Sequence, residues 1–116
     1  MQSIVVIHPT LGPVASSVRV ATRFREKLVG LMGVPTLPPG EGMLFAHTNA
    51  VHGCFMREPL WLIYLTQAQV VVRIATLRPW RSGPIIPQAH WVLELSIRTS
   101  LDGMQVGDVL KWTEST

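Results

Sequence analysis

Cysteine is almost absent from the sequence, which contains one residue of this type, Cys54. A single cysteine excludes an internal disulfide, so the fold cannot depend on an oxidising compartment. Long apolar runs are absent as well, because no stretch approaches the ~20 residues that span a bilayer. The apolar run near the N-terminus is too short for a signal peptide. These absences predict a cytoplasmic protein without a membrane partner.

Charged residues are also scarce, at 15% of the 116 residues, and no basic run occurs although the net charge is +3. This pattern argues against a nucleic-acid partner. Hydrophobic residues make up 47% of the chain, which supplies one core, whereas a second core would need roughly another hundred residues. We therefore expect a single domain over residues 1–116. Its low fraction of charged residues would suit a homodimer with an apolar interface.

Short apolar or alternating runs bounded by Gly, Pro and Asn predict β-strands. The predicted strands cover residues 3–7, 14–21, 43–46, 51–56, 60–65, 70–77, 91–95 and 106–112. Between the second and third, Thr22 is a candidate N-cap, and Phe24, Leu28 and Leu31 recur at helical spacing until Gly33. The expected fold is mainly β (α+β): a small curled antiparallel sheet or partly open β-barrel, with one amphipathic helix covering an opening.

Six short motifs occur in a characteristic order along the chain. They are Arg25 with Gly30-Leu31-Met32, Gly42-Met43-Leu44-Phe45, His52 with Phe55-Met56-Arg57, Leu77-Arg78-Pro79-Trp80-Arg81, Val92-Leu93-Glu94-Leu95 and Gly107-Asp108. Over about residues 18–110 this pattern resembles the family called domain of unknown function 192. The resemblance implies a compact, mostly β domain that is widespread in bacteria and archaea. It implies no established activity.

Two positions depart from that family's pattern. Family members usually carry an aspartate two residues beyond the proline of the Phe-Met-Arg-x-Pro signature, and here that position is Trp61. The usual Pro-Ala-Gly after the Leu-Glu-Leu run is replaced by Ser96-Ile97-Arg98, which removes a glycine from a turn. A polar site that the family builds on these positions would be altered or lost in this chain.

Metal binding and thiol chemistry are both weakly indicated. His47, His52 and Cys54 could supply three zinc ligands with an open fourth position. No fourth ligand follows nearby, and a lone cysteine is more often a buried apolar residue than a ligand or nucleophile. We expect neither a metal nor an organic cofactor.

Arg57 and Glu94 each place a charge in an apolar segment, where it is costly unless it is paired or faces a cleft. One interpretation is a structural ion pair in which Arg57 or Arg25 neutralises Glu94. The other is that Arg57 joins the arginines on either side of Trp80 around a pocket for a small anion. The planar guanidinium suits carboxylate or phosphate, and an indole offers a stacking face.

Two classes of function follow from these residues. The first is a non-catalytic domain that binds a small anionic ligand or a protein partner through His52, Arg57, Arg78, Trp80, Arg81 and Glu94. The alternative is a hydrolase-like enzyme with His52 and Glu94 as acid and base. Of the remaining aromatic residues, Trp61 and Trp91 are expected in the core and Trp80 at the surface. Asp108 is expected to set a turn after Gly107.

Overall fold

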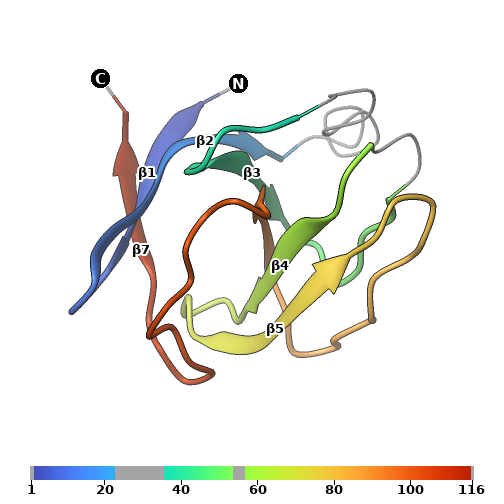
Figure 1. Cartoon of the computed structure of the whole chain (residues 1–116). Helices are drawn as coiled ribbons and strands as arrows, with labels where there is room; N and C mark the ends of the chain where they lie inside the picture. The colour runs from blue at the N-terminus through green and yellow to red at the C-terminus, as the bar shows by residue number, and fades with distance from the viewer. Residues whose placement is uncertain (1, 23–35, 54–56, 116) are drawn as a thin grey trace.

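The chain forms one seven-stranded β-sheet, shown in a computed structural model that describes residues 2–22, 36–53 and 57–115 (Figure 1). The strands are β1 (Ser3–His8), β2 (Gly12–Ala21), β3 (Glu41–Ala46), β4 (Leu60–Leu65), β5 (Val71–Leu77), β6 (Trp91–Ser96) and β7 (Lys111–Glu114). Their order in the sheet is β5-β4-β6-β3-β2-β1-β7. The mainly β prediction is confirmed.

The sheet is mixed, because one parallel strand pair interrupts the expected antiparallel pairing. β2 and β3 pair in parallel, with Val18 opposite Gly42, while every other strand pair is antiparallel. Antiparallel neighbours can be joined by a tight turn, whereas parallel neighbours need a crossover connection. The chain between Ala21 and Glu41 is that crossover.

The predicted N-terminal hairpin is confirmed. β1 and β2 pair from Ser3 opposite Arg19 to His8 opposite Gly12, with register shifts on both sides of Val6. Gly12 follows the turn at residues 9–11 and has a φ of 80°, a left-handed conformation that glycine adopts without steric cost. The turn thus lies just before the Gly-Pro pair.

The sheet curls until its two ends approach each other (Figure 1), but it is not a closed barrel. Three backbone hydrogen bonds connect residues 69–71 to residues 107–110: Val71 N–H to Asp108 O at 2.8 Å, Gly107 N–H to Val71 O at 2.7 Å, and Leu110 N–H to Gln69 O at 3.0 Å. Residues 107–110 therefore hold the start of β5. They do not continue the last strand, which starts at Lys111 and not at residue 106 as predicted.

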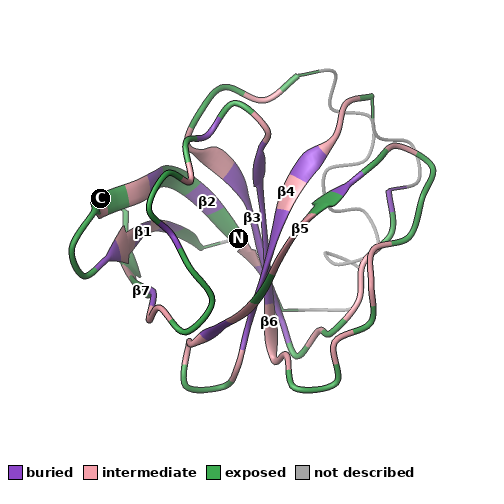
Figure 2. Ribbon diagram, turned by 60° about the horizontal axis from the view of Figure 1, so that its bottom comes forward, coloured by how far each residue is buried: buried purple, intermediate pink, exposed green. Residues whose placement is uncertain are grey.

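Alternation along each strand divides the buried side chains between two core clusters. In β6, Leu93 and Leu95 belong to the first cluster, which also contains Ile4 of β1, Val18 of β2 and Leu110 of the segment before β7. Val92 of the same strand belongs to the second cluster. That cluster also contains Ala21, Met43, Phe45, Leu60, Leu62, Tyr64 and Leu77. In Figure 2 the central strands are accordingly mostly buried.

The predicted amphipathic helix at residues 22–33 falls almost entirely outside the described residues. So does the second half of the strand predicted at residues 51–56, and in its first half His52 forms a single antiparallel bridge with Ser82. Within the described ranges no helix is long and apolar enough to cross a membrane.

Candidate functional site

Two loop segments pair to form a ribbon over the second core cluster. We define this cover ribbon as residues 47–53 together with residues 78–90. Trp80 N–H donates to Gly53 O at 2.7 Å, Gly53 N–H donates to Arg81 O at 2.6 Å, and Gly83 N–H donates to Val51 O at 2.9 Å. The structure therefore brings together two motifs that lie about thirty positions apart in the sequence.

Close packing makes glycine necessary at position 53. A Cβ atom there would lie 2.4 Å from Arg78 O and 3.1 Å from Arg81 O. The facing turn is closed by a hydrogen bond from Arg81 N–H to Arg78 O at 3.1 Å, and Trp80 within it has a φ of 63°. A left-handed tryptophan is uncommon and requires support from its surroundings. The hydrogen bonds from Trp80 N–H to Gly53 O and from Gly53 N–H to Arg81 O provide this support.

Tyr64 of β4 ties the cover ribbon to the sheet. Its hydroxyl donates a hydrogen bond to Pro84 O at 2.8 Å. Burial raises the pKa of Tyr64 to about 12, so the hydroxyl keeps its proton at neutral pH and remains a donor. At the end of the ribbon, His90 N–H donates to Leu65 O of the same strand at 2.8 Å.

The ribbon presents the predicted binding residues to solvent. His52, Arg78 and Arg81 are exposed, and Trp80 is 63% exposed. Arg78 and Arg81 border a hollow of about 490 Å³. Its other lining residues are Pro59, Thr76, Pro79 and Ile97.

Arg57 is exposed and lies two positions before Pro59, which lines the hollow, but Arg57 does not line it. Between described residues, a hydrogen bond joins His8 to Asp108 and an ion pair joins Arg98 to Glu58, so neither carboxylate neutralises Arg57 or the two arginines of the ribbon.

Glu94 lies apart from this surface. It points to the same side of β6 as Val92, opposite Met43 of β3 and Leu62 of β4, and is only 3% exposed. Burial raises the pKa of its carboxyl group to about 8. The predicted ion pair between Arg57 and Glu94 is not formed, and Arg25, the alternative partner, is outside the described residues.

Glu58 pairs with Arg98 instead, through Arg98 Nη1 and Glu58 Oε1 at 2.7 Å. The hydrogen bond from Arg98 lowers the pKa of Glu58, and a second hydrogen bond from Leu37 N–H acts in the same direction. This contact links the segment before β4 to the turn after β6. Neither residue was among the predicted site residues.

The two departures from the family pattern are both built into the fold. Trp61 is half-buried against the first core cluster and donates from Nε1 to Thr99 O at 3.1 Å. The Ser96 hydroxyl donates to Leu37 O at 2.7 Å and accepts a hydrogen bond from Arg98 N–H at 3.2 Å. Arg98 does not have a positive φ, so its turn does not require glycine.

The hypothetical zinc site finds no support among the described residues, where no group of three or more His, Cys, Asp or Glu could hold a metal ion. Cys54 is outside them. His47 packs edge to face on His90, with 4.5 Å between the ring centroids, and His90 packs similarly on Trp91. These two imidazoles form an aromatic row that continues to Trp91.

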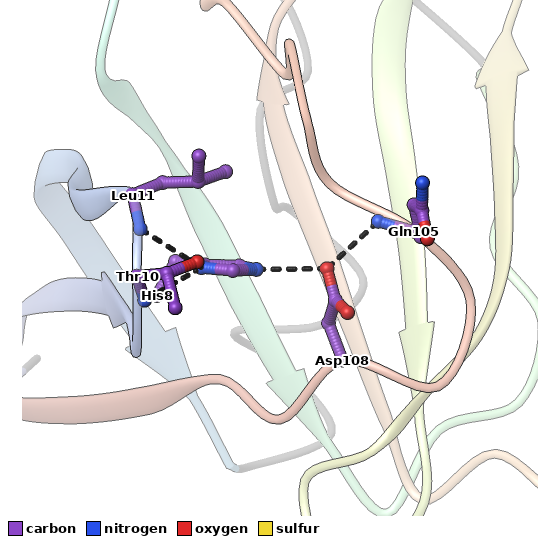
Figure 3. A network of polar contacts seen from close by, with 5 residues as sticks. All are labelled: His8, Thr10, Leu11, Gln105 and Asp108. Atoms are coloured by element: carbon purple, nitrogen blue, oxygen red, sulfur yellow. Dashed lines mark hydrogen bonds and ion pairs between the residues drawn. The ribbon is translucent and has the colours of Figure 1, made fainter.

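The sequence did not predict a network of polar contacts among the described residues that is centred on His8 (Figure 3). His8 is 6% exposed, and its Nδ1 accepts hydrogen bonds from the backbone N–H groups of Thr10 and Leu11, both at 3.1 Å. Nδ1 therefore carries no proton, and Nε2–H donates to Asp108 Oδ2 at 2.7 Å. The only sequence signal was a histidine at the end of an apolar strand.

Asp108 does set a turn, as predicted, because its Oδ2 also accepts Gln105 N–H at 2.8 Å. The hydrogen bond from His8 lowers the pKa of this carboxyl group, with a further contribution from Gln105. Since both nitrogens of the His8 ring are occupied, the pair fastens the β1–β2 turn to residues 105–108. It is not arranged for proton transfer to a ligand.

Comparison with known proteins gives consistent matches over most of the chain. Residues 6–112 match the family domain of unknown function 192, described as an uncharacterized ACR. UPF0127 proteins of Pyrococcus abyssi and Pyrococcus furiosus are 32% and 33% identical over 103 residues, which cover 82% of this chain and 85% of each relative.

Two crystal structures are similar in fold. A protein of unknown function from Novosphingobium aromaticivorans superposes with a TM-score of 0.77 at 25% identity, covering 95% of this chain and 84% of its own. A putative transcription regulator from Sinorhizobium meliloti superposes with a TM-score of 0.73 at 24% identity, covering 96% and 92%. From the family match and the identity to the UPF0127 proteins, the chain belongs to the domain of unknown function 192 family.

Proposed function

We propose that the chain is a non-catalytic binding domain that takes a small anionic ligand at the hollow between Arg78 and Arg81. The observation that carries this proposal is the pair of exposed guanidinium groups beside a hollow of about 490 Å³. Neither forms an ion pair with another described residue. Their positive charges are therefore available to a carboxylate or phosphate.

The backbone beneath the two arginines supports a binding role. Arg78 and Arg81 are held by the turn that packs on Gly53, so the bases of both side chains are fixed before a ligand arrives. A fixed backbone lowers the entropy cost of binding. Arginine also matches carboxylate and phosphate with two parallel hydrogen bonds. Trp80 lies between the two arginines and offers an exposed ring to a ligand with a flat part.

The enzyme alternative needs His52 and Glu94 to act on the same substrate. His52 is exposed on the ribbon, whereas Glu94 is 3% exposed beneath it, next to Met43 and Leu62. A general acid must reach the proton acceptor directly or through one water molecule. This difference in burial weighs against the pair as an acid and base, and we prefer the binding role.

Calorimetric titration with inorganic phosphate and with citrate at low salt tests the proposal. We expect at least one of them to bind, and the variant Arg78→Gln/Arg81→Gln to lose that binding while its thermal unfolding is unchanged. Arg57→Met should weaken binding less, because Arg57 does not line the hollow. Arg19→Gln, which removes an exposed charge from β2, is the matched control.

Binding of neither anion, or equal binding by the double variant, would reject the proposal.

Assembly as a homodimer and a cytoplasmic location are separate parts of the proposed function. The low charge content of 15% supports the first, and the single cysteine supports the second. Sedimentation velocity of the purified chain decides the first, and fractionation of cells that produce it decides the second.

A further inference from the structure

The cover ribbon has an unusual composition. Its two segments, residues 47–53 and 78–90, contain no Asp or Glu, two arginines, and His47, His52 and His90. Three of the chain's four histidines thus lie in this one element. The two arginines give the ribbon positive charge at neutral pH.

The ribbon also has two different faces. Its inner side chains, Val51, Ile86 and Ala89, pack on the second core cluster. On its outer side, Trp80 is 63% and Ile85 is 70% exposed. They are two of the four large hydrophobic side chains that the described residues expose, and the other two, Leu11 and Val106, lie in separate turns elsewhere.

The backbone holds this exposed apolar pair in place. Hydrogen bonds to residues 49–53 occur on both sides of it, from Trp80 N–H to Gly53 O at 2.7 Å and from Ile86 N–H to Asn49 O at 3.0 Å. Single exposed apolar residues are normal on a protein surface. Here an indole and an aliphatic side chain occur in one hydrogen-bonded segment that also carries two arginines and no acid.

We propose that the outer face of the cover ribbon binds the surface of an anionic lipid bilayer. Arg78 and Arg81 contact headgroup phosphates, Trp80 lies at the level of the headgroups, and Ile85 enters the acyl boundary. This goes beyond the proposed function and shares with it only the two arginines, because the anion here is a lipid phosphate within a bilayer surface. The ribbon lies on the side of the molecule away from β1 and β7 (Figure 1), so a bilayer can approach it without contacting that edge.

The chemistry of the patch favours lipid over nucleic acid. Guanidinium groups and an indole would serve either partner, but the most exposed apolar side chain of the patch, Ile85, is aliphatic and cannot stack on a base. Transfer of this side chain out of water is favourable only into an apolar phase. Attachment of this kind requires no membrane-spanning helix, since the ribbon only reaches the interface.

Sedimentation with vesicles tests the proposal, using vesicles of phosphatidylcholine with or without phosphatidylglycerol. We expect the chain to sediment with the phosphatidylglycerol vesicles at low salt, and to be released by high salt. Replacing one arginine by glutamine should weaken partitioning about fivefold, as expected for one charge near an anionic surface. Ile85→Ser should weaken it about tenfold if most of the side chain enters the apolar phase.

The matched controls are Val106→Ser, which removes an apolar side chain of similar exposure elsewhere, and Arg19→Gln. Both should partition like the unmodified chain. Bromine on the lipid acyl chains should quench tryptophan emission in the parent chain and much less in Trp80→Phe. No sedimentation with phosphatidylglycerol vesicles, or unchanged partitioning of Ile85→Ser, would overturn the proposal, as would binding of a DNA duplex in place of vesicles.

Titration with phosphate and citrate separates this inference from the proposed function. If a soluble anion binds at the arginines but vesicles do not sediment the chain, the bilayer inference fails and the binding function stands. If vesicles sediment the chain and neither anion binds, the bilayer inference stands and the small-ligand function fails. If neither occurs, both fail.

Discussion

His8 and Asp108 are one hundred residues apart in the sequence and are joined by a contact of 2.7 Å between Nε2 and Oδ2. The contact fixes the tautomer of His8, because the other ring nitrogen accepts backbone hydrogen bonds from Thr10 and Leu11. One imidazole thereby connects the turn after β1 to the turn before β7. Its role is structural, and it can be measured.

We expect His8→Ala to lower the free energy of unfolding by about 2 kcal/mol, because two backbone N–H groups lose their acceptor next to a buried site. Denaturant unfolding monitored by circular dichroism measures this. Asp108→Asn should cost less, since an amide oxygen can still accept Gln105 N–H. Asp102→Asn, in an exposed loop, is the control, and a neutral His8→Ala would contradict the structural role.

Because the carboxyl group of Glu94 is buried, we expect the stability of the fold to decline as the pH rises. In the unfolded chain its carboxyl loses a proton near the ordinary pKa of 4.5, whereas in the folded chain the proton is kept up to a pKa of about 8. The folded state binds the extra proton between these values, so stability is fully present below pH 4.5 and is lost as pH rises through 8. Between these two pKa values, each rise of one pH unit lowers the free energy of unfolding by up to ~1.4 kcal/mol.

Glu94→Gln keeps the shape of the protonated acid and should remove this decline, so that the variant is several kcal/mol more stable than the parent at pH 8. Thermal unfolding between pH 5 and 9 measures the difference. Glu41→Gln in β3, whose side chain is only half-buried, should keep the parent profile. Parallel profiles for the parent and Glu94→Gln would show that the buried carboxyl does not hold its proton.

Acid should destabilise the fold in a separate range of pH. The folded state lowers the pKa values of Asp108 and Glu58 below their ordinary values of 3.8 and 4.5. Their stabilisation is therefore present above these values and is lost as the pH falls through the lowered pKa values. We expect Asp108→Asn to flatten the profile of unfolding free energy below pH 4, and to lower it by a constant amount above pH 5.

Gly53→Ala should disturb the binding surface, because the new Cβ atom would lie 2.4 Å from Arg78 O. We expect a loss of about 1–3 kcal/mol in stability, typical of overpacking, together with weaker anion binding. Gly12→Ala is the control, since its Cβ meets nothing within 4 Å and only its φ of 80° opposes the change. It should lose about 1 kcal/mol and bind anions normally.

Substitutions of Trp61 test whether this departure from the family pattern stabilises the fold. Trp61→Phe should cost about 1 kcal/mol, the net value of the hydrogen bond to Thr99 O. Trp61→Asp restores the residue usual in the family but replaces a half-buried ring, so a loss of roughly 3 kcal/mol is expected. A stable Trp61→Asp variant would mean that the indole contributes little to the first core cluster. Guanidinium unfolding of both variants measures these differences.

Local sequence signals were sufficient for most of the strands. The range predicted for β4, residues 60–65, agrees with the structure, and the ranges for β3, β5 and β6 differ by one or two residues. Strong apolar runs with Gly or Pro boundaries explain this success. The last strand was placed too early, because Val109 and Leu110 bond to the segment before β5 and do not pair as a strand with β1.

The candidate site was predicted less completely. The meeting of His52 with the Arg78–Arg81 turn depends on ribbon hydrogen bonds through Gly53 that no local pattern reveals. Likewise, the partner of His8 is one hundred residues away and could not be deduced from either residue alone. The sequence predicted Glu94 either in an ion pair or on a binding surface, whereas alternation along β6 turns its side chain toward the core, where it is 3% exposed.

The position of β6 governs how the chain can fold during synthesis. β6 occupies residues 91–96, yet it lies between β3 and β4 in the middle of the sheet. Until it emerges from the ribosome, the β1–β2–β3 unit and the β4–β5 hairpin have no strand between them, and each keeps an open edge. Open strand edges pair readily with other chains. The nascent protein is therefore most exposed to aggregation in the interval before β6 emerges, when β1 to β5 have already been made.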